Sequence, residues 1–409
     1  MWYPLKLLLR RIVMHGDLTV VDGSGTSHRF GDGTPPCVVM RLADRSIERQ
    51  LAFDPQLILG EAYMTGRLRM EQGLLYDLLA LLLGNIGMMR EPRALARFDL
   101  RRRLLRRLVQ FNPVMRARRN VKHHYDIDTA IYDLFLDSDR QYSCAYFAPG
   151  SGLEEAQLAK KRHLAAKLLI RSNHYVLDIG CGWGGLALYL AKATGCSVTG
   201  ITLSDNQLAF ARRRAEQQGL AGAVRFELED YRCVRGTFDR IVSVGMFEHV
   251  GVAHYGTFFR KLAELLRPDG VAIVHSIGRA DGPGFTNPFI GKYIFPGGYF
   301  PALSEVLPAA ERAGLIVGDV EVLRLHYAET LRAWRERFMA GRGTAAALKG
   351  ETFCRMWEYY LAAAEASFRY YGLMVFQLQL IKRIDALPIT RDYMFAEERR
   401  LADAERGHP

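Results

Sequence analysis

From residue 175 onward, the chain alternates short apolar runs with stretches of helical periodicity. The apolar runs are YVLDIG, SVTGITL, VRFELEDY, FDRIVSVG and VAIVHSIG, and helical stretches such as LALYLAKAT and NQLAFARRRAEQQG lie between them. Continuous apolar runs of this length are typical of strands that are buried on both faces. The repeated order of strand, helix and strand predicts an α/β fold with a parallel, doubly wound sheet.

The N-terminal part of the chain has a different pattern, with short strand-like runs bounded by turn residues. We expect strands at Leu18–Asp22, at Cys37–Leu42 and around Ala62–Met70, within a small N-terminal α+β domain. The C-terminal third, from about Arg332, is predicted to be mostly helical and is rich in aromatic residues. The expected organisation is a smaller domain over residues 1–115 and a larger domain over residues 116–409.

Neither the start of the chain nor its most apolar stretch predicts a membrane-spanning helix. Leu74–Met89 is interrupted by Asp77 and Asn85 and is shorter than the roughly 20 residues that span a bilayer. The first residues, MWYPLKLLLRRIVMHGDL, include basic side chains and no small-residue cleavage site, so we predict no signal peptide. We therefore expect a soluble or peripheral protein, cytoplasmic and bound to the inner membrane face.

A strongly basic segment lies between the two predicted domains. Phe98–Lys122 reads FDLRRRLLRRLVQFNPVMRARRNVK, with leucines at helical spacing and arginines on the remaining faces. This pattern predicts a basic amphipathic helix, followed by a linker near Pro113. Three interpretations remain open: a helix that binds an anionic membrane, a solvated face that pairs with acidic residues, and a helix that contacts RNA.

Composition narrows the class of protein without choosing a function. A chain of 409 residues with 49% hydrophobic and 24% charged residues is globular and is expected to form two or three domains. Its net charge of +11 attracts anions, including nucleic acid, anionic lipid and acidic substrates. The six cysteines are scattered, with no zinc-like spacing, which indicates a reducing compartment.

A glycine-rich turn follows the first of the buried strands. VLDIGCGWGGLAL places Gly180, Gly182 and Gly184 between an apolar strand and an apolar helix, where glycine lets the backbone approach a ligand closely. The GxGxG spacing differs from the GxGxxG of dinucleotide-binding folds and favours S-adenosylmethionine. Asp178 precedes the turn and could hold the ammonium group of this ligand through solvent. The alternative is a tight connection that binds nothing.

Several further motifs make the likeness to a known family specific. LDIGCGWGGLA, GITLSDNQ, FDRIVSVGMFEHVG, HSIG and KYIFPGG resemble, in order and spacing, the family of cyclopropane-fatty-acid synthases and mycolic-acid cyclopropane synthases, over roughly Lys122–Arg383. The resemblance implies a Rossmann-like class I methyltransferase sheet with helical additions. It also implies a set of cofactor-binding residues: Tyr142, Ser143, Asp178, Gly180, Cys181, Gly182, Gly184, Thr202, Leu203, Gln207, Asp230 and Tyr231.

One position of the cofactor site departs from the usual methyltransferase pattern. The second strand ends without the acidic residue that normally binds ribose, and Gln207 resembles the replacement found in this family. Asp205 is adjacent, but it is at least as well explained as the N-cap of the next helix.

Methylation of an unactivated alkene creates a carbocation, so the reaction needs a dry site and a base. The resemblance implies that a bound bicarbonate is this base, held by catalytic residues that include a backbone contribution: Cys144, Glu248, His275, Ile277 and Tyr327. Such residues can donate to and accept from one small oxyanion. Taken singly, Glu248 is equally well read as a structural carboxylate and His275 as a hydrogen-bonded core histidine.

Aromatic residues accompany these motifs and could stabilise a cation, although some must belong to the core. They are Phe247, Tyr293, Phe295, Tyr299 and Phe300. Many family members carry a cysteine where this chain has Ala364, which argues against a covalent cysteine mechanism here.

The predicted function is that of a cyclopropane-fatty-acyl-phospholipid synthase. It would transfer a methylene from S-adenosylmethionine to a cis double bond of phospholipid acyl chains, through a carbocation that bicarbonate deprotonates. The expected partners are an unsaturated, preferably anionic bilayer and a second copy of the chain, with no nucleic acid. The alternatives are a fatty-acid methyltransferase with a methylene-branched, methyl-branched or furan-precursor product, an amine methyltransferase, an RNA methyltransferase and a catalytically inactive lipid-binding protein.

Overall fold

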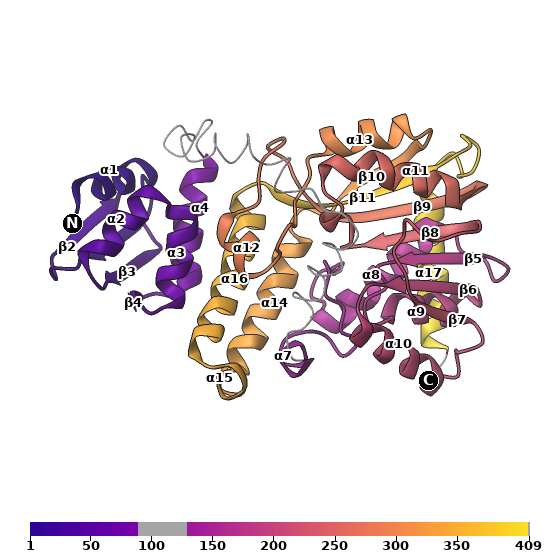
Figure 1. The fold of residues 1–409 in the computed structure, drawn as a ribbon, viewed down its shortest axis with the longest axis horizontal. Coiled ribbons are helices and arrows are strands. Elements are labelled where there is room, and N and C mark those ends of the chain that lie inside the picture. Colours follow the sequence, from indigo (N-terminus) through magenta and orange to yellow (C-terminus); the bar gives the residue numbers. More distant parts are fainter. Residues whose placement is uncertain (89–128, 408–409) are drawn as a thin grey trace. The chain divides into compact units, whose positions relative to one another are not determined.

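The computed structural model describes residues 1–88 and 129–407, which form two compact units (Figure 1). The first unit combines residues 1–88 with Phe285–Pro296 and Ala328–Leu373, and the second contains the rest. The chain therefore passes between the units several times. The expected boundary at residues 115 and 116, and the basic segment Phe98–Lys122, lie outside the described residues, so both remain predictions from the sequence.

The second unit is built on a seven-stranded sheet with the order β10-β11-β9-β8-β5-β6-β7. Neighbouring strands from β9 to β7 are parallel, and β10 is antiparallel to β11. This sheet confirms the predicted α/β fold, although β10 and β11 were not foreseen. The strands are β5 (Tyr175–Ile179), β6 (Ser197–Thr202), β7 (Val224–Leu228), β8 (Phe238–Val244), β9 (Leu266–Arg279), β10 (Ile316–Val322) and β11 (Leu373–Ile381).

Helices cover both faces of this sheet (Figure 1). Side chains alternate along each strand, so that Val176 of β5 joins the core under one set of helices and Leu177 joins the core under the other. The first set is α8 (Leu153–Leu168), α9 (Gly185–Thr194), α10 (Asp205–Gln217) and α17 (Asp392–Arg406), and the second is α11 (Tyr255–Leu265) and α13 (Leu303–Arg312). Short helical turns in this unit are α7 (Thr129–Asp133), η1 (Phe247–His249) and η2 (Val252–His254).

The first unit contains a four-stranded sheet with the order β2-β1-β3-β4. Its strands are β1 (Asp17–Val21), β2 (Ser27–Gly31), β3 (Cys37–Leu42) and β4 (Leu68–Gln72). Its N-terminal helices are α1 (Tyr3–Ile12), α2 (Arg45–Phe53), α3 (Pro55–Met64) and α4 (Leu75–Met88). The later segments add α12 (Pro288–Tyr293), α15 (Arg342–Lys349), α16 (Glu351–Tyr370) and most of α14 (His326–Ala340).

Two of the three strands expected in this unit are confirmed, by β1 and β3, and the third is wrong in its first half. Ala62 lies in α3, and the chain becomes extended only at Leu68. Asp54 caps α3 by accepting a hydrogen bond from the amide of Leu57, and Pro55 occupies the first helical turn. These two start signals favour a helix over the strand that the apolar pattern suggested.

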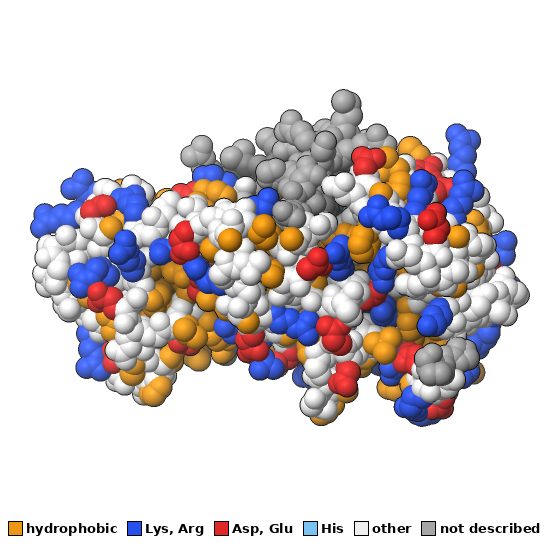
Figure 2. All heavy atoms as spheres, turned by 90° about the horizontal axis from the view of Figure 1, so that it is seen from below, with side chains coloured by type: hydrophobic (Ala, Val, Ile, Leu, Met, Phe, Trp, Pro, Cys, Tyr) orange, Lys and Arg blue, Asp and Glu red, His pale blue; other side chains and the backbone are white. Residues whose placement is uncertain are grey.

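Helix α4 is apolar on two sides because each side packs into a different hydrophobic core. Leu78 and Leu81 pack into the core formed by residues 1–88, whereas Leu75 and Leu79 pack against Tyr359 and other residues of α16. Among residues 1–88 and 129–407, no helix is long and apolar enough to cross a membrane. On the face drawn in Figure 2, basic side chains are interspersed with acidic ones instead of forming one continuous patch.

Candidate active site

A recess opens at the carboxyl ends of the parallel strands, where the strand order turns from β8 to β5 and β6. Ligands of doubly wound sheets bind at such a switch point. The recess holds about 790 Å³ of empty space, part of it open to solvent, which suits a ligand of nucleoside size. It is lined by Ile179, Gly180, Gly182, Ile201, Thr202, Leu203, Gln207, Glu229, Asp230, Tyr231, Arg232, Val244, Gly245, Met246, His249 and Val250.

The glycine-rich turn forms one wall of the recess, and its glycines have different roles. Gly180 and Gly182 line the recess with φ angles of 85° and 54°, a region that disfavours side chains. Gly184 does not line it: a Cβ there would lie 2.7 Å from the ring of Phe226, so this glycine allows α9 to pack closely on the sheet. Cys181 is buried in the core beneath the turn.

The end of β6 forms the adjacent wall and presents one amide. Gln207 is buried, and its Oε1 accepts a hydrogen bond from Thr202 Oγ1 at 2.9 Å, so its Nε2 remains to donate. Ser204, and not Asp205, is the N-cap of α10, because its hydroxyl accepts from the amide of Gln207. Asp205 is exposed in the first helical turn and does not line the recess.

The segment after β7 closes the recess with an acidic and an aromatic side chain. Asp230 is buried and forms a two-point ion pair with Arg232, at 2.8 Å and 2.7 Å. Tyr231 packs edge-on against Phe258, with ring centroids 5.3 Å apart, and burial raises the pKa of its hydroxyl to about 12. Arg232 and Glu229, which also line the recess, were not identified from the sequence.

Asp178 lies below the glycine-rich turn and is almost completely buried. Its Oδ2 has no hydrogen-bond partner within the described part of the chain. Burial raises the pKa of this carboxyl to about 7, although the positive charge of Lys160 acts in the opposite direction. An unpaired buried carboxylate is costly, so Asp178 is a candidate for pairing with a cationic group of a ligand.

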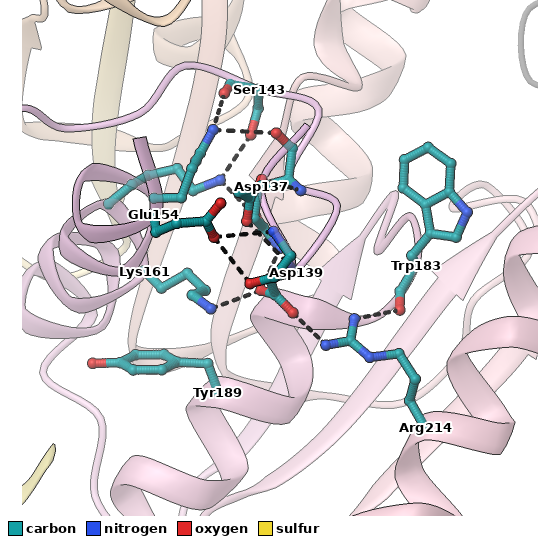
Figure 3. A network of polar contacts seen from close by, with 12 residues as sticks. Asp137, Asp139, Ser143, Glu154, Lys161, Trp183, Tyr189 and Arg214 are labelled. Carbon is teal, nitrogen blue, oxygen red and sulfur yellow. Dashed lines mark hydrogen bonds and ion pairs between the residues drawn. The ribbon is translucent and has the colours of Figure 1, made fainter. Parts of the chain in front are cut away.

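Tyr142 and Ser143 do not line the recess. They belong to a loop whose Asp139 is linked through Arg214 to Trp183 of the glycine-rich turn (Figure 3). Asp139 of this loop forms ion pairs with Lys161 and Arg214, and Arg214 also donates to the carbonyl of Trp183 in the turn, at 3.2 Å. The arginine thus ties the loop to the turn. The ring of Tyr132 lies between them, with its centroid 5.5 Å from Tyr142 and 5.1 Å from Trp183.

A buried lysine at the base of this loop was missed from the sequence. Lys160 of α8 donates to Gln141 and to the hydroxyl of Ser143, at 2.9 Å for the latter. Burial lowers the pKa of its ammonium to about 8. Its charge lowers the pKa values of both Asp178 and His275, so one ammonium affects the ionisation of a carboxyl on β5 and of an imidazole on β9.

Glu248 is positioned between two residues that line the recess. It follows β8 in the turn η1, directly before His249 and two residues after Met246. Its Oε1 accepts a hydrogen bond from the amide of Ile277 on β9 at 2.7 Å, whereas its Oε2 is buried without a partner among the described residues. Burial raises the pKa of this carboxyl to about 7, against the effect of the Ile277 hydrogen bond.

His275 lies on β9, two residues before Ile277, and is 2% exposed. Its Nδ1 is 3.2 Å from Nε2 of Gln377. Burial, together with the charges of Lys160 and Lys167, lowers the pKa of its imidazole to about 3. Glu248 thus contacts β9 at Ile277, and His275 lies two residues earlier on the same strand, paired with Val244 at the end of β8.

Cys144 and Tyr327 are both buried, and the segments that carry them contact each other within the second unit. The amide of Phe147, three residues after Cys144, donates to Nδ1 of His326 at 2.9 Å, and His326 directly precedes Tyr327. The ring of Tyr146 stacks on that of His326, with centroids 4.7 Å apart. These contacts fix the two segments against each other.

The aromatic residues expected near the site are partly explained as core. Phe247 is fully buried and stacks on Tyr255, with ring centroids 4.5 Å apart. Tyr299 is also fully buried, and its hydroxyl donates to Glu305 at 2.7 Å. Tyr293 and Phe295 belong to the first unit.

Comparison with known proteins identifies relatives over most of the chain. Residues 113–378 match the family model described as mycolic acid cyclopropane synthetase. A probable fatty acid methyltransferase of Pseudomonas putida is 42% identical over 288 residues, which cover 67% of this chain and 73% of the relative. The cyclopropane-fatty-acyl-phospholipid synthase of Escherichia coli is 40% identical over 264 residues, which cover 64% and 68% of the two chains.

Two further matches are a relative that covers more of this chain and a solved structure. The tuberculostearic acid methyltransferase of Mycobacterium tuberculosis is 35% identical over 399 residues, which cover 92% of this chain and 90% of the relative. The solved structure of mycolic acid cyclopropane synthase CmaA1, complexed with SAH and CTAB, superposes with a TM-score of 0.62 at 33% identity. It covers 66% of this chain and 99% of that one.

Proposed function

Because the chain belongs to the mycolic acid cyclopropane synthetase family, whose relatives are S-adenosylmethionine-dependent cyclopropane synthases and fatty-acid methyltransferases, we propose that it adds a methylene to the cis double bond of a phospholipid acyl chain. The chain is a methyltransferase that uses S-adenosylmethionine. The proposal concerns the acceptor, the base and the product.

The observation that carries the proposal is the position of Glu248. It lies between Met246 and His249, which line the recess, and its unpartnered Oε2 is buried beside β9. A methyl acceptor that becomes a cation must lose a proton close to the methyl donor, in a place from which water is excluded. A buried carboxylate next to the recess can hold such a base in that place.

The recess fits S-adenosylmethionine by the chemistry of its walls. The backbone at Gly180 and Gly182 allows close approach of the amino-acid part, and the buried Asp178 would balance its ammonium group, through solvent. The Nε2 of Gln207 would donate to a ribose hydroxyl. Leu203, Asp230 and Tyr231 line the part of the recess that remains for the adenine ring. Bound there, S-adenosylmethionine supplies an electrophilic methyl group.

The groups around Glu248 also fit a bicarbonate ion, which when bound supplies the base. The Oε2 of Glu248 would accept from its hydroxyl, and His275 and Tyr327 would donate to its oxygens. The amide of Ile277 already donates to Glu248, so Ile277 would act by fixing that carboxylate. The backbone near Cys144 would contribute further donors. Position 364, on α16, is an alanine and carries no nucleophile, so we propose no covalent cysteine mechanism.

A methyl-branched fatty acid is the second candidate product. The match to the tuberculostearic acid methyltransferase covers 92% of this chain, whereas the match to the Escherichia coli enzyme covers 64%. The same cation can lead to two products. If the new methyl group loses a proton, its carbon can bond to the cationic carbon and close a ring. If a different proton leaves, an alkene forms, which a reductase could saturate. The reaction product distinguishes the two.

Purified protein, S-adenosylmethionine and liposomes of cis-unsaturated phospholipid should suffice for product formation. We expect the acyl chain to gain one CH₂ by mass and to resist hydrogenation under conditions that saturate an alkene, because ring closure needs no reductant. Mass analysis of the extracted lipid measures both properties. A product that hydrogenates readily would assign the chain to the branched-chain reaction instead.

Gly182→Ala tests the recess as the cofactor site. Gly182 has a positive φ angle, and a Cβ there would have no protein atom within 4 Å, so the variant should fold. Its new methyl group would occupy space on the wall of the recess and should weaken S-adenosylmethionine binding by about tenfold or more, which corresponds to about 1.4 kcal/mol. Gly219→Ala is the matched control: it has a similar φ angle of 68° and equally open surroundings outside the recess. If calorimetry gives the two variants equal affinities for S-adenosylmethionine, the turn at Gly182 does not contact the cofactor.

We also propose that the chain works as a homodimer on the inner face of a membrane, with the basic segment as its contact with anionic lipid. Replacing Arg102, Arg103, Arg106 and Arg107 with Glu should weaken co-sedimentation with anionic liposomes and remove its salt dependence, because each basic residue near such a surface contributes about 1 kcal/mol. Neutral liposomes serve as the control. Unchanged sedimentation, combined with lost RNA binding, would favour the RNA interpretation.

A further inference from the structure

Three buried side chains on three different elements form a hydrogen-bonded series that ends at His275. Lys167 of α8 donates from Nζ to Oε1 of Gln377 on β11 at 3.0 Å, and Nε2 of Gln377 lies 3.2 Å from Nδ1 of His275 on β9. Lys167 and Gln377 are each 1% exposed and His275 is 2% exposed. Neither Lys167 nor Gln377 has a role in the function proposed above.

The chemistry of these groups fixes the direction of each hydrogen bond. An ammonium can only donate, so the amide oxygen of Gln377 must face Lys167. The amide NH₂ of Gln377 must then face His275 and donate to it. A ring nitrogen that accepts a hydrogen bond carries no proton, so in the neutral ring the proton resides on Nε2.

The surroundings of His275 keep its ring neutral as well as oriented. Lys160, Lys167 and His163 all oppose a positive charge on the ring, and burial acts in the same direction. Glu321 acts in favour of the charge, but it already pairs with Lys167 and His163. Lys167 in turn forms an ion pair with Glu321, so the donor at the start of the series is held in place.

We propose that Gln377, oriented by Lys167, is a positioning residue that fixes His275 as the neutral tautomer with its proton on Nε2. His275 then offers a hydrogen-bond donor and cannot remove a proton through Nδ1. The hydrogen bond to Gln377 engages Nδ1, so Nε2 is the ring nitrogen that would donate to an oxyanion. The catalytic meaning of the tautomer rests on the proposed function, whereas the tautomer itself does not.

Nitrogen NMR of the full-length protein, labelled with ¹⁵N-histidine, tests the tautomer directly. His275→Asn identifies the signals of His275. We expect an unprotonated Nδ1 and a protonated Nε2 in the wild-type protein, with no titration between pH 6 and 8. A proton on Nδ1, or titration in this range, would overturn the proposal.

Two variants separate positioning from packing. Gln377→Glu places a carboxylate between Lys167 and His275 that can only accept, so the proton should move to Nδ1 and turnover should fall about 10–100-fold with S-adenosylmethionine affinity unchanged. Gln379→Met is the matched control. Gln379 lies two residues along β11, is equally buried and donates to the carbonyl of Lys167 and to Tyr393. This control should lose stability without changing the signals of His275.

The readouts also separate failure of this inference from failure of the proposed function. Lipid methylation by a wild-type protein that carries its proton on Nδ1 would overturn the inference alone. The expected tautomer in a protein that modifies no lipid would support the inference and contradict the function. If Gln377→Glu leaves the signals of His275 unchanged, Gln377 does not position the ring.

Discussion

Glu248→Gln should retain S-adenosylmethionine binding and lose most turnover, by about 10²–10⁴-fold. The amide oxygen of the variant can still accept from Ile277, so the local fold should persist. Its NH₂ group, however, would replace the unpartnered Oε2 with a donor. The variant would thus lose the acceptor that helps to hold the base and would present a donor in its place. Steady-state turnover on liposomes and calorimetric titration of the cofactor measure the two effects.

The pH dependence of turnover provides a second test of Glu248. Its raised pKa of about 7 means that the carboxyl is largely protonated at pH 6 and ionised at pH 8. Turnover should therefore rise across this interval in the wild-type enzyme, and this rise should be absent from the residual activity of Glu248→Gln. Near wild-type turnover in the variant, or no response to removal of bicarbonate, would contradict the proposed role.

Asp178→Asn should weaken S-adenosylmethionine binding by about 10–100-fold, because it removes the charge that balances the ammonium group of the ligand. The raised pKa of about 7 predicts that affinity in the wild-type protein falls as the pH is lowered below 7 and the carboxylate takes up a proton. The variant should show no such decrease. Methylthioadenosine lacks the ammonium group, so its affinity should be the same for both proteins.

The same substitution should stabilise the ligand-free protein at alkaline pH. The folded-state pKa of Asp178 lies above its ordinary value of 3.8, so the folded state holds a proton that the unfolded state has lost. The free energy of unfolding therefore decreases as pH rises from about 4 to 7, and Asn removes this contribution. Thermal unfolding at pH 5 and pH 8 measures the difference. A variant that is weaker in binding and also less stable at pH 8 would indicate that Asp178 serves the fold and not the ligand.

The sequence predicted the sheet and the glycine-rich turn because both depend on local pattern. Apolar runs identify buried strands, and Gly180 and Gly182 stand where the backbone needs left-handed conformations. The strand β10 was not foreseen, because its pairing with β11 brings together segments far apart in the sequence. The role of Gly184 in helix packing also requires knowledge of Phe226, which lies on another strand.

Polar residues in α8 could not be assigned to the site from their pattern alone. The segment EEAQLAKKRHLAAKLL is charged on most faces, and such a helix normally exposes its lysines. In the fold, α17 and the sheet cover it, and Lys160 and Lys167 become almost completely buried. Their partners, Ser143 and Gln377, lie outside the helix, 17 and 210 residues away along the chain. Periodicity cannot identify such pairs, which is why these lysines were missed.

The division of α4 between two cores affects how the protein folds during synthesis. The N-terminal segment can bury Leu78 and Leu81 as soon as it emerges from the ribosome, whereas Leu75 and Leu79 must wait for α16, nearly 300 residues later. At about 5–20 residues per second this delay is on the order of 15–60 seconds. A nascent chain with an apolar helix face exposed for that time is a substrate for chaperones. Truncation before α16 should therefore yield an aggregation-prone N-terminal fragment.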